Sequence, residues 1–273
     1  MSMFINTNVA AINSHRNLSA NNTAMGKTME KLSSGYRINR AADDAAGLAI
    51  SEKMRYQING LNQAQRNAQD GISLIQTAEG ALTEVHAMLQ RINTLANQSA
   101  NGTYNSTEDR TALQAEVAEL SLEIDKIATT TNFNGIKLLD GTQTEVKFQV
   151  GVESSDKITL SLQDLTSATL GVSGLDISTS AGANTALDGI KAMITTVSTA
   201  RGAFGAVQNR LEHTINNLGV TSENLSASES RIRNADMAKE MTDFTRNQIL
   251  VQAGTSMLAQ ANSMPQNVLK LLG

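Results

Sequence analysis

The sequence predicts a mainly α-helical protein: an elongated antiparallel bundle of long helices with a small β-hairpin tip, plus a terminal two-helix coiled coil formed by the N- and C-termini. Three observations predict this class. Only one proline occurs in 273 residues, so little interrupts a helix. Apolar residues recur at steps of three, four and seven. Aromatic residues make up only 3% of the chain and tryptophan is absent, which favours thin helical packing over a thick globular core.

The first long helix is predicted from an apolar stripe between Met54 and Leu95. Fifty helical residues at 1.5 Å each would extend about 75 Å. The segment "NGTYNS" at 101–106 then breaks the pattern. Ser106, followed three residues later by Asp109, resembles a helix cap, and a second, antiparallel helix is expected after it.

The middle of the chain changes to a strand pattern. Apolar residues alternate in "EVKFQV" and again in "KITLSL", and the linker "GVESSD" joins them. This alternation predicts a β-hairpin within about 140–165. The Gly-, Ser- and Thr-rich stretch that follows is expected to be connecting structure at the far tip of the rod.

A third long helix is expected to begin near Thr185, with Asp188 in the capping-box position. Its stripe continues towards the C-terminus, and "RNAD" at 233–236 is the expected joint. Because a one-sided helix is only marginally stable alone, this helix should pack on the 48–128 helical hairpin. The predicted division is a discontinuous terminal domain, 1–40 with 235–273, and a rod domain, 41–234.

The two ends of the chain are alike in composition. Residues 1–40 carry five basic and one acidic side chain, and residues 231–273 carry five and three, whereas the whole chain has a net charge of −4. Both ends have apolar positions with no evident cover, and we hypothesise that both segments fold only against copies of themselves. The expected polymerisation residues are Ile5, Val9, Ile12, Leu258, Val268, Leu269, Leu271 and Leu272.

Composition and motifs give no support to catalysis or cofactor binding. The chain has no cysteine, which excludes disulfides and thiolate chemistry. Asp43 and Asp44 are adjacent and would face different ways on a helix. His15, His86 and His213 lack a second ligand at zinc spacing, and no G-x-S-x-G motif occurs. We expect no cofactor, no nucleic-acid partner and no membrane insertion.

Several segments resemble the conserved regions of bacterial flagellins. They are "KLSSGYRINRAADDAAGLAISEKMR" (31–55), "QDGISLIQTAEGALTEVHAMLQR" (69–91), "NRLEHTINNL" (209–218), "ENLSASESRIRNADMAKEM" (223–241) and "MLAQANSMPQNVLKLLG" at the C-terminus. The resemblance covers about 1–140 and 185–273. The chain is therefore similar to a minimal flagellin without large outer domains. It implies a structural subunit, not an enzyme, that is exported unfolded and polymerises into the extracellular filament used for swimming.

The resemblance also implies partners. These are further copies of the chain, an export chaperone on about 235–273, the filament cap, the hook–filament junction proteins and the animal Toll-like receptor for flagellin. The receptor and protofilament contact carries over to Arg91, Leu95 and Glu116. The sequence departs from the family pattern at Asn93 and Thr94, where bulkier and more charged residues are common.

Two other protein classes are alternatives to a filament subunit. A hook–filament junction protein of the same family shares the terminal pattern, although the near-complete core motifs favour flagellin. A secreted, membrane-active amphipathic helix would need basic faces with bulky apolar anchors, which the Asn-, Gln- and Ala-rich termini lack.

Overall fold

This computed structural model describes the backbone of residues 7–103 and 107–272 and the side chains of 7–103 and 108–264. The described chain forms, in order, α1 (Val9–Ser34), α2 (Ala45–Ala100), α3 (Thr107–Thr130), β1 (Asn132–Phe133), β2 (Ile136–Lys137), β3 (Glu145–Gln149), β4 (Lys157–Ser161), α4 (Ser167–Leu170), the 3-10 turn η1 (Val172–Gly174), α5 (Ser180–Arg233) and α6 (Met237–Leu272). The mainly helical class is confirmed, and the expected cap at Ser106 lies outside the described residues.

The chain divides into two compact units. One unit, which we call the terminal unit, contains residues 1–56 and 223–273, and the other, the central unit, contains residues 57–222. The division therefore falls inside α2 and α5 and assigns more of the chain to the terminal unit than the expected joints at 40 and 235.

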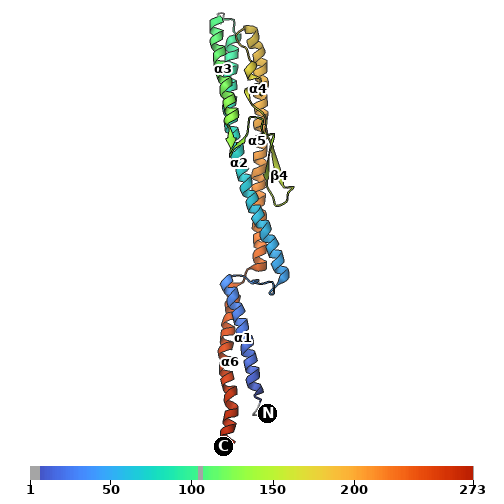
Figure 1. Ribbon diagram of the computed structural model, residues 1–273, viewed down its shortest axis with the longest axis vertical. Coiled ribbons are helices and arrows are strands. Elements are labelled where there is room, and N and C mark those ends of the chain that lie inside the picture. Colours follow the sequence, from blue (N-terminus) through green and yellow to red (C-terminus); the bar gives the residue numbers. More distant parts are fainter. Residues whose placement is uncertain (1–6, 104–106, 273) are drawn as a thin grey trace. The chain divides into compact units, whose positions relative to one another are not determined.

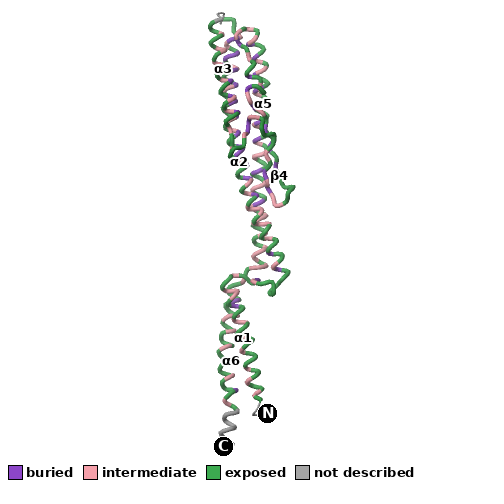
Figure 2. Tube along the Cα trace, in the orientation of Figure 1, coloured by how far each residue is buried: buried purple, intermediate pink, exposed green. Residues whose placement is uncertain are grey.

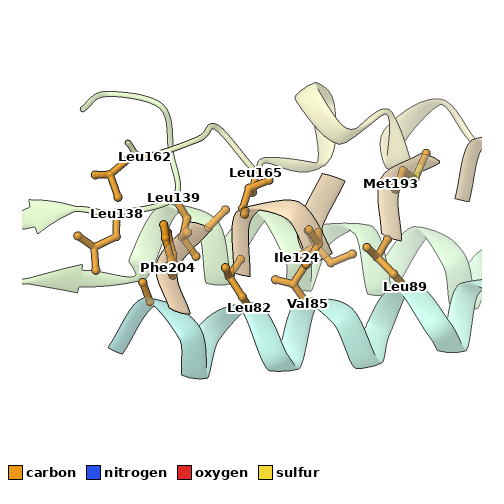
Figure 3. Packing of buried hydrophobic residues seen from close by; sticks show 14 of the residues in the cluster. Leu82, Val85, Leu89, Ile124, Leu138, Leu139, Leu162, Leu165, Met193 and Phe204 are labelled. Atoms are coloured by element: carbon orange, nitrogen blue, oxygen red, sulfur yellow. The ribbon is translucent and has the colours of Figure 1, made fainter. Parts of the chain in front are cut away.

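The central unit contains the hydrophobic core. α2, α3 and α5 lie side by side in it, and the buried apolar cluster extends from Ala68 to Leu211 (Figures 1 and 2). Leu82, Val85 and Leu89 follow one another along one face of α2 and pack with Ile124 and Phe204 (Figure 3). The three-and-four spacing of the sequence thus produces a long, thin core, as its periodicity predicts.

The predicted hairpin is formed by β3 and β4, which pair antiparallel with Phe148 opposite Ile158. It does not lie at the tip of the bundle, and this part of the prediction is wrong. The amide of Asn67 donates to the carbonyl of Gln149 at 3.0 Å, and Phe148 lies against Gly71, so the strands cover α2 well away from the α2–α3 turn. The reason is that α3 first carries the chain back along α2 by about 36 Å.

Two side chains of α3 hold the segment that connects the hairpin to α5. The Asp125 carboxylate accepts hydrogen bonds from the backbone N–H and the hydroxyl of Ser167, both at 2.7 Å. The Gln114 amide donates to the carbonyl of Leu175 at 3.0 Å and accepts from the N–H of Ile177 at 2.7 Å. The stretch expected to be loose connecting structure is therefore fixed against a helix.

α5 begins at Ser180, five residues before the predicted start near Thr185. The Thr179 hydroxyl accepts the N–H of Gly182 at 3.0 Å and so caps the helix. Asp188, which the sequence placed in a capping box, lies inside the helix. The earlier start was missed because the glycine-rich stretch before Thr185 disfavours helix on its own, whereas packing of the buried Ala183 and Ala186 stabilises it.

The terminal unit is built on α1 and α6, which run antiparallel (Figure 1). The Asn8 amide donates to the carbonyl of Ala261 at 2.7 Å, and Lys31 pairs with Glu240 at 3.4 Å. Among the described residues of this unit, the buried apolar side chains are only Ile38 and Ala261. The pair therefore has almost no core of its own.

Candidate functional site

The joint of the terminal unit connects α1 to α2 and α5 to α6. A short antiparallel bridge joins the two connectors: the N–H of Arg37 donates to the carbonyl of Arg233 at 2.7 Å, and the N–H of Ala235 donates to that of Gly35 at 2.9 Å. Gly35 has φ 74°, a conformation that glycine adopts without strain, and it ends α1. A break between helices is present at the expected segment 233–236, since α5 ends at Arg233 and α6 begins at Met237.

A cluster of charged and aromatic side chains reinforces this joint. The guanidinium of Arg233 lies 4.9 Å from the ring centroid of Tyr36 and pairs with Glu52. The Arg233 hydrogen bond, assisted by its charge, lowers the pKa of Glu52. Sequence reasoning missed this cluster because its members lie 16 to 197 positions apart and belong to no local motif.

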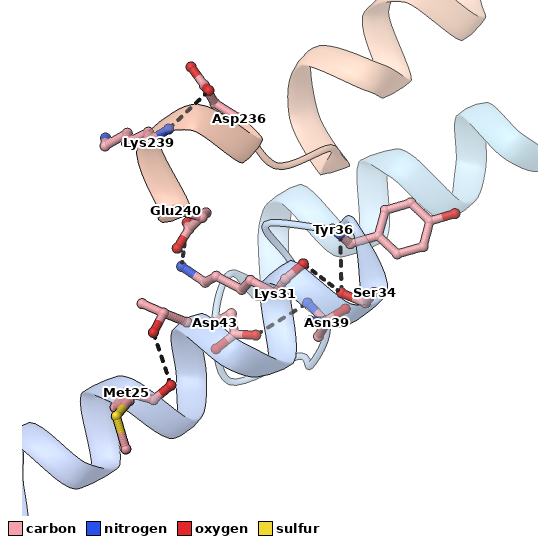
Figure 4. Close-up of polar contacts among 10 residues, drawn as sticks. Met25, Lys31, Ser34, Tyr36, Asn39, Asp43, Asp236, Lys239 and Glu240 are labelled. Atoms are coloured by element: carbon pink, nitrogen blue, oxygen red, sulfur yellow. Dashed lines mark hydrogen bonds and ion pairs between the residues drawn. The ribbon is translucent and has the colours of Figure 1, made fainter. Parts of the chain in front are cut away.

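Asp43 and Asp44 are turn-forming and capping residues. Asp43 accepts the backbone N–H group of Arg40 at 3.1 Å. It also accepts that of Asn39 at 3.2 Å (Figure 4). These hydrogen bonds, the one from Arg40 first, lower the pKa of the Asp43 carboxyl. Asp44 accepts the N–H of Gly47 at 2.8 Å and caps α2. The two carboxylates thus bind backbone amides separately and do not form an acid–base pair.

Large exposed apolar side chains are concentrated in the terminal unit. All of them among the described residues belong to it except Leu122, Ile136 and Val220. The terminal unit thus combines the smaller core with the larger exposed apolar surface. A distribution of this kind marks an interaction surface, because single exposed apolar residues would otherwise be scattered over both units.

One face of α6 carries this apolar character in a regular row. Leu250, Met257 and Met264 are exposed and spaced seven residues apart, and Ile249 lies beside the first of them. We call these four residues the outer stripe. Gly254, where an added methyl would meet Leu18 of α1, lies one turn from both Leu250 and Met257, so the stripe borders the α1-facing side of the helix. A seven-residue apolar repeat is the pattern that pairs helices in coiled coils, so the stripe suits another helix.

Three of the predicted polymerisation residues have described side chains. Val9 and Ile12 are exposed on α1, whereas Leu258 is half-buried. Ile5 lies outside the described residues, as do the side chains of Val268, Leu269, Leu271 and Leu272, although α6 itself extends to Leu272.

The residues expected to form the receptor and protofilament contact divide into two groups. Arg91 of α2 pairs with Glu116 of α3 at 2.7 Å, and both side chains are about half exposed. The hydrogen bond from Arg91 to Glu116 raises the pKa of Arg91. Leu95, by contrast, is only 1% exposed and belongs to the core. Leu95 can therefore support the Arg91–Glu116 surface from beneath but does not line it.

The histidines form no shared site. His86 contacts the Gln90 amide at 2.9 Å, while His15 lies in α1 and His213 in α5. Across residues 7–103 and 107–272, no three histidine, aspartate or glutamate side chains converge as metal ligands. No helix in those ranges contains a stretch long and apolar enough to span a membrane.

Comparison with known proteins assigns the family. The chain matches the bacterial flagellin N-terminal helical region over residues 5–144 and the C-terminal helical region over 187–272. The chain belongs to the bacterial flagellin family. It is 57% identical to a flagellin of Halalkalibacterium halodurans over 272 residues, which cover 99% of the chain and all of that relative. It is 49% identical to the flagellar filament 33 kDa core protein of Treponema phagedenis over 286 residues, with the same coverage.

A solved structure gives the same result. The crystal structure of Bacillus cereus flagellin is 38% identical and superposes with a TM-score of 0.51, covering 56% of this chain and 88% of that one. The match to a flagellin along the full length supports the flagellin prediction and not the junction-protein alternative.

Proposed function

We propose that this chain is the structural subunit of a bacterial flagellar filament, which serves swimming motility outside the cell, and that it has no catalytic activity. The observation that carries this proposal is the outer stripe of α6, an exposed apolar heptad row on a unit with almost no core. Each large apolar side chain that another copy covers contributes about 1.5–3 kcal/mol. A contact between unlike faces whose rotation does not close into a ring propagates as a helical fibre.

The terminal helices take their final form in the assembled state. An isolated helix pair with little buried apolar surface is marginally stable in water, since backbone entropy opposes it. The α1–α6 pair buries so few apolar residues that neighbouring copies supply most of its stabilisation. In dilute solution, both terminal segments are therefore largely unfolded.

Substitutions on the outer stripe test the assembly proposal. In a double stripe variant, both Leu250 and Met257, of which Met257 is 63% exposed, are replaced by glutamate. Filaments are counted by electron microscopy after salt-induced assembly. We expect this double variant to lose assembly, while the central unit keeps its helical circular dichroism. The matched control Gln252→Glu adds the same charge to an exposed position off the stripe and should assemble normally. Normal filaments from the double stripe variant would contradict the proposal.

The C-terminal region, about 235–273, binds an export chaperone before secretion, and the assembled chain contacts the filament cap and the hook–filament junction proteins. An exposed apolar stripe on an unfolded tail is an aggregation hazard, so a cytoplasmic partner that covers it is physically reasonable. The absence of cysteine suits export of an unfolded chain, because no cross-link can block its passage. Loss of chaperone binding in the double stripe variant, measured by calorimetry, would support this assignment, and unchanged binding would contradict it.

The Arg91–Glu116 surface binds the Toll-like receptor for flagellin in the unassembled chain. The exposure of both side chains supports this role, and the pair can offer charge and hydrogen bonds in a fixed geometry. Arg91→Ala should weaken binding to the receptor ectodomain by about tenfold, since a hydrogen-bonded charge is lost. Lys126→Ala, which removes another exposed cation of the central unit, is the control. Equal effects of the two changes would contradict a specific role for Arg91.

A further inference from the structure

A buried charge lies in the contact between α1 and α6. Glu240, which is 9% exposed, is the only charged residue that is buried among those whose side chains the structure describes. Its partner is Lys31, with Nζ 3.4 Å from Oε1 (Figure 4). An ion pair in such a place is weak evidence for stability, because desolvation offsets the attraction between the charges. A different role has to explain it.

The rest of the α1–α6 contact specifies its register poorly. Leu18 packs against Gly254, which has no side chain. The Asn8 side chain binds a main-chain carbonyl, that of Ala261, and every residue carries such a group. Small and polar side chains dominate elsewhere on both helices, so sliding one helix along the other by a heptad would cost little apolar contact.

We propose that Lys31 and Glu240 are the specificity-determining pair that fixes the register of α1 against α6. A slip of seven residues in one direction would place Glu240 opposite Ala24, beside Met25, and the nearest cation, Lys27, would lie three residues further along α1. A slip in the other direction would place Lys31 opposite Asn247. Either slip breaks the direct Lys31–Glu240 pair and leaves each charge with an oppositely charged residue only about one turn out of register, so the direct pair favours the observed alignment. Single buried polar residues set register in coiled coils in the same way.

The backbone bridge at the joint is the competing explanation. Its two hydrogen bonds, between Arg37 and Arg233 and between Ala235 and Gly35, also align the helices at that end. Of the four residues that form these bonds, Arg37 is exposed, whereas Gly35, Arg233 and Ala235 are half-buried, so the bridge can also contribute to the alignment. The test must therefore separate the ion pair from the bridge.

The register has a consequence for assembly, and this step rests on the proposed function. A slip of α6 would move Leu250, Met257 and Met264 relative to α1 by about 10 Å. Copies in different registers would then present different surfaces to their neighbours. The register of the pair is itself a property of one chain and can be measured without filaments.

Cysteine pairs report the register directly, because the chain has no cysteine of its own. A Cβ at position 254 would lie 3.8 Å from the Cβ of Leu18, close to the separation typical of a disulfide. Leu18→Cys with Gly254→Cys therefore reports the native register. In the variant Leu18→Cys with Asn247→Cys, the second cysteine lies seven residues, about 10 Å, further along α6 than position 254. This pair can form a disulfide only after a slip. Intrachain and interchain products separate on non-reducing gels.

Each cysteine pair is placed in three backgrounds: the natural charges, the apolar Lys31→Met with Glu240→Leu, and the reversed Lys31→Glu with Glu240→Lys. The full chain is oxidised both as filaments and unassembled in an osmolyte that favours the folded terminal pair. The reversed background keeps the pair but opposes both helix dipoles, since Lys31 lies in the last turn of α1 and Glu240 in the first turn of α6. It should therefore be less stable and yet keep its register.

With natural charges we expect the 18–254 bridge to exceed the 18–247 bridge by at least about tenfold. The apolar background should reduce this preference to about threefold or less without lowering the melting temperature, and the reversed background should keep it. An unchanged preference in the apolar background would overturn the proposal and assign the register to the backbone bridge. If the disulfide measurements in the three backgrounds give the expected results but no variant assembles, the register proposal stands and the proposed function fails.

Discussion

The Asp125 clamp on α4 offers a quantitative test of the packing described for the central unit. Replacing Asp125 by alanine removes the acceptor of two hydrogen bonds, from the N–H and the hydroxyl of Ser167, each 2.7 Å long. Ser167 is buried, so water cannot fully replace that acceptor. A hydrogen bond to a charged group contributes about 1.5–3 kcal/mol, and the lower value is appropriate for a half-buried carboxylate. We therefore expect Asp125→Ala to lower the free energy of unfolding by about 3 kcal/mol.

Urea unfolding of the unassembled chain, followed by far-ultraviolet circular dichroism, measures this free energy. A double-mutant cycle with Ser167→Ala isolates the bond to the hydroxyl, and its coupling should be about 1.5 kcal/mol. The control Glu123→Ala removes an exposed acid on the same helix, whose pair with Lys126 is solvated, and should change stability by less than about 0.5 kcal/mol. If Asp125→Ala costs no more than Glu123→Ala, the clamp does not hold the connecting segment.

Three further predictions concern single residues. Gly26→Ala should stabilise α1 in filaments by up to about 1 kcal/mol, because nothing lies within 4 Å of the new methyl group. Gly254→Ala should stabilise α6 less, because its methyl group would come 3.3 Å from Leu18. Thermal melting of filaments compares the two variants, and equal gains in stability would refute close packing at Gly254. Leu95→Ala should destabilise the central unit by about 2–5 kcal/mol in urea, while a value below about 1 kcal/mol would show that this side chain is not in the core. The pKa of Asp43 is lower in the folded chain than its ordinary value of 3.8, so its contribution is present above that value and is lost as the pH falls through the lower, folded pKa. The protection of the two backbone amides that it binds, measured in filaments relative to their intrinsic exchange at the same pH, should therefore fall at acidic pH, and Asp43→Asn should abolish this change in protection.

Periodicity was sufficient to predict the long helices and the hairpin, because these elements depend on local repeats. The stripe between Met54 and Leu95 became one face of α2, and the alternation around Phe148 became β3. Neither pattern holds information on where separate elements meet. The position of the hairpin against Gly71 depends on the length of α3, and the start of α5 depends on core packing beyond Thr185.

The candidate site was predictable in its composition but not in its geometry. Apolar residues near both termini predict an interaction surface, and two of them, Val9 and Ile12, are exposed in the unassembled chain. The sequence could not show that Leu95 points into the core while Arg91, four residues earlier, remains exposed, because both belong to the same helical pattern. It also gave no signal for the Lys31–Glu240 pair, whose members lie 209 positions apart.

Hydrogen exchange of the backbone amides of α1 and α6, compared between dilute unassembled chain and filaments, tests most directly whether other copies complete these helices. We expect exchange in the unassembled chain to approach that of an unfolded peptide over most of 9–34 and 237–264, and to slow by at least about a hundredfold in filaments. The amides of the central unit should be protected in both states. Strong protection of α1 and α6 already present in the dilute chain, unchanged by assembly, would contradict the proposal that these helices are completed by their neighbours.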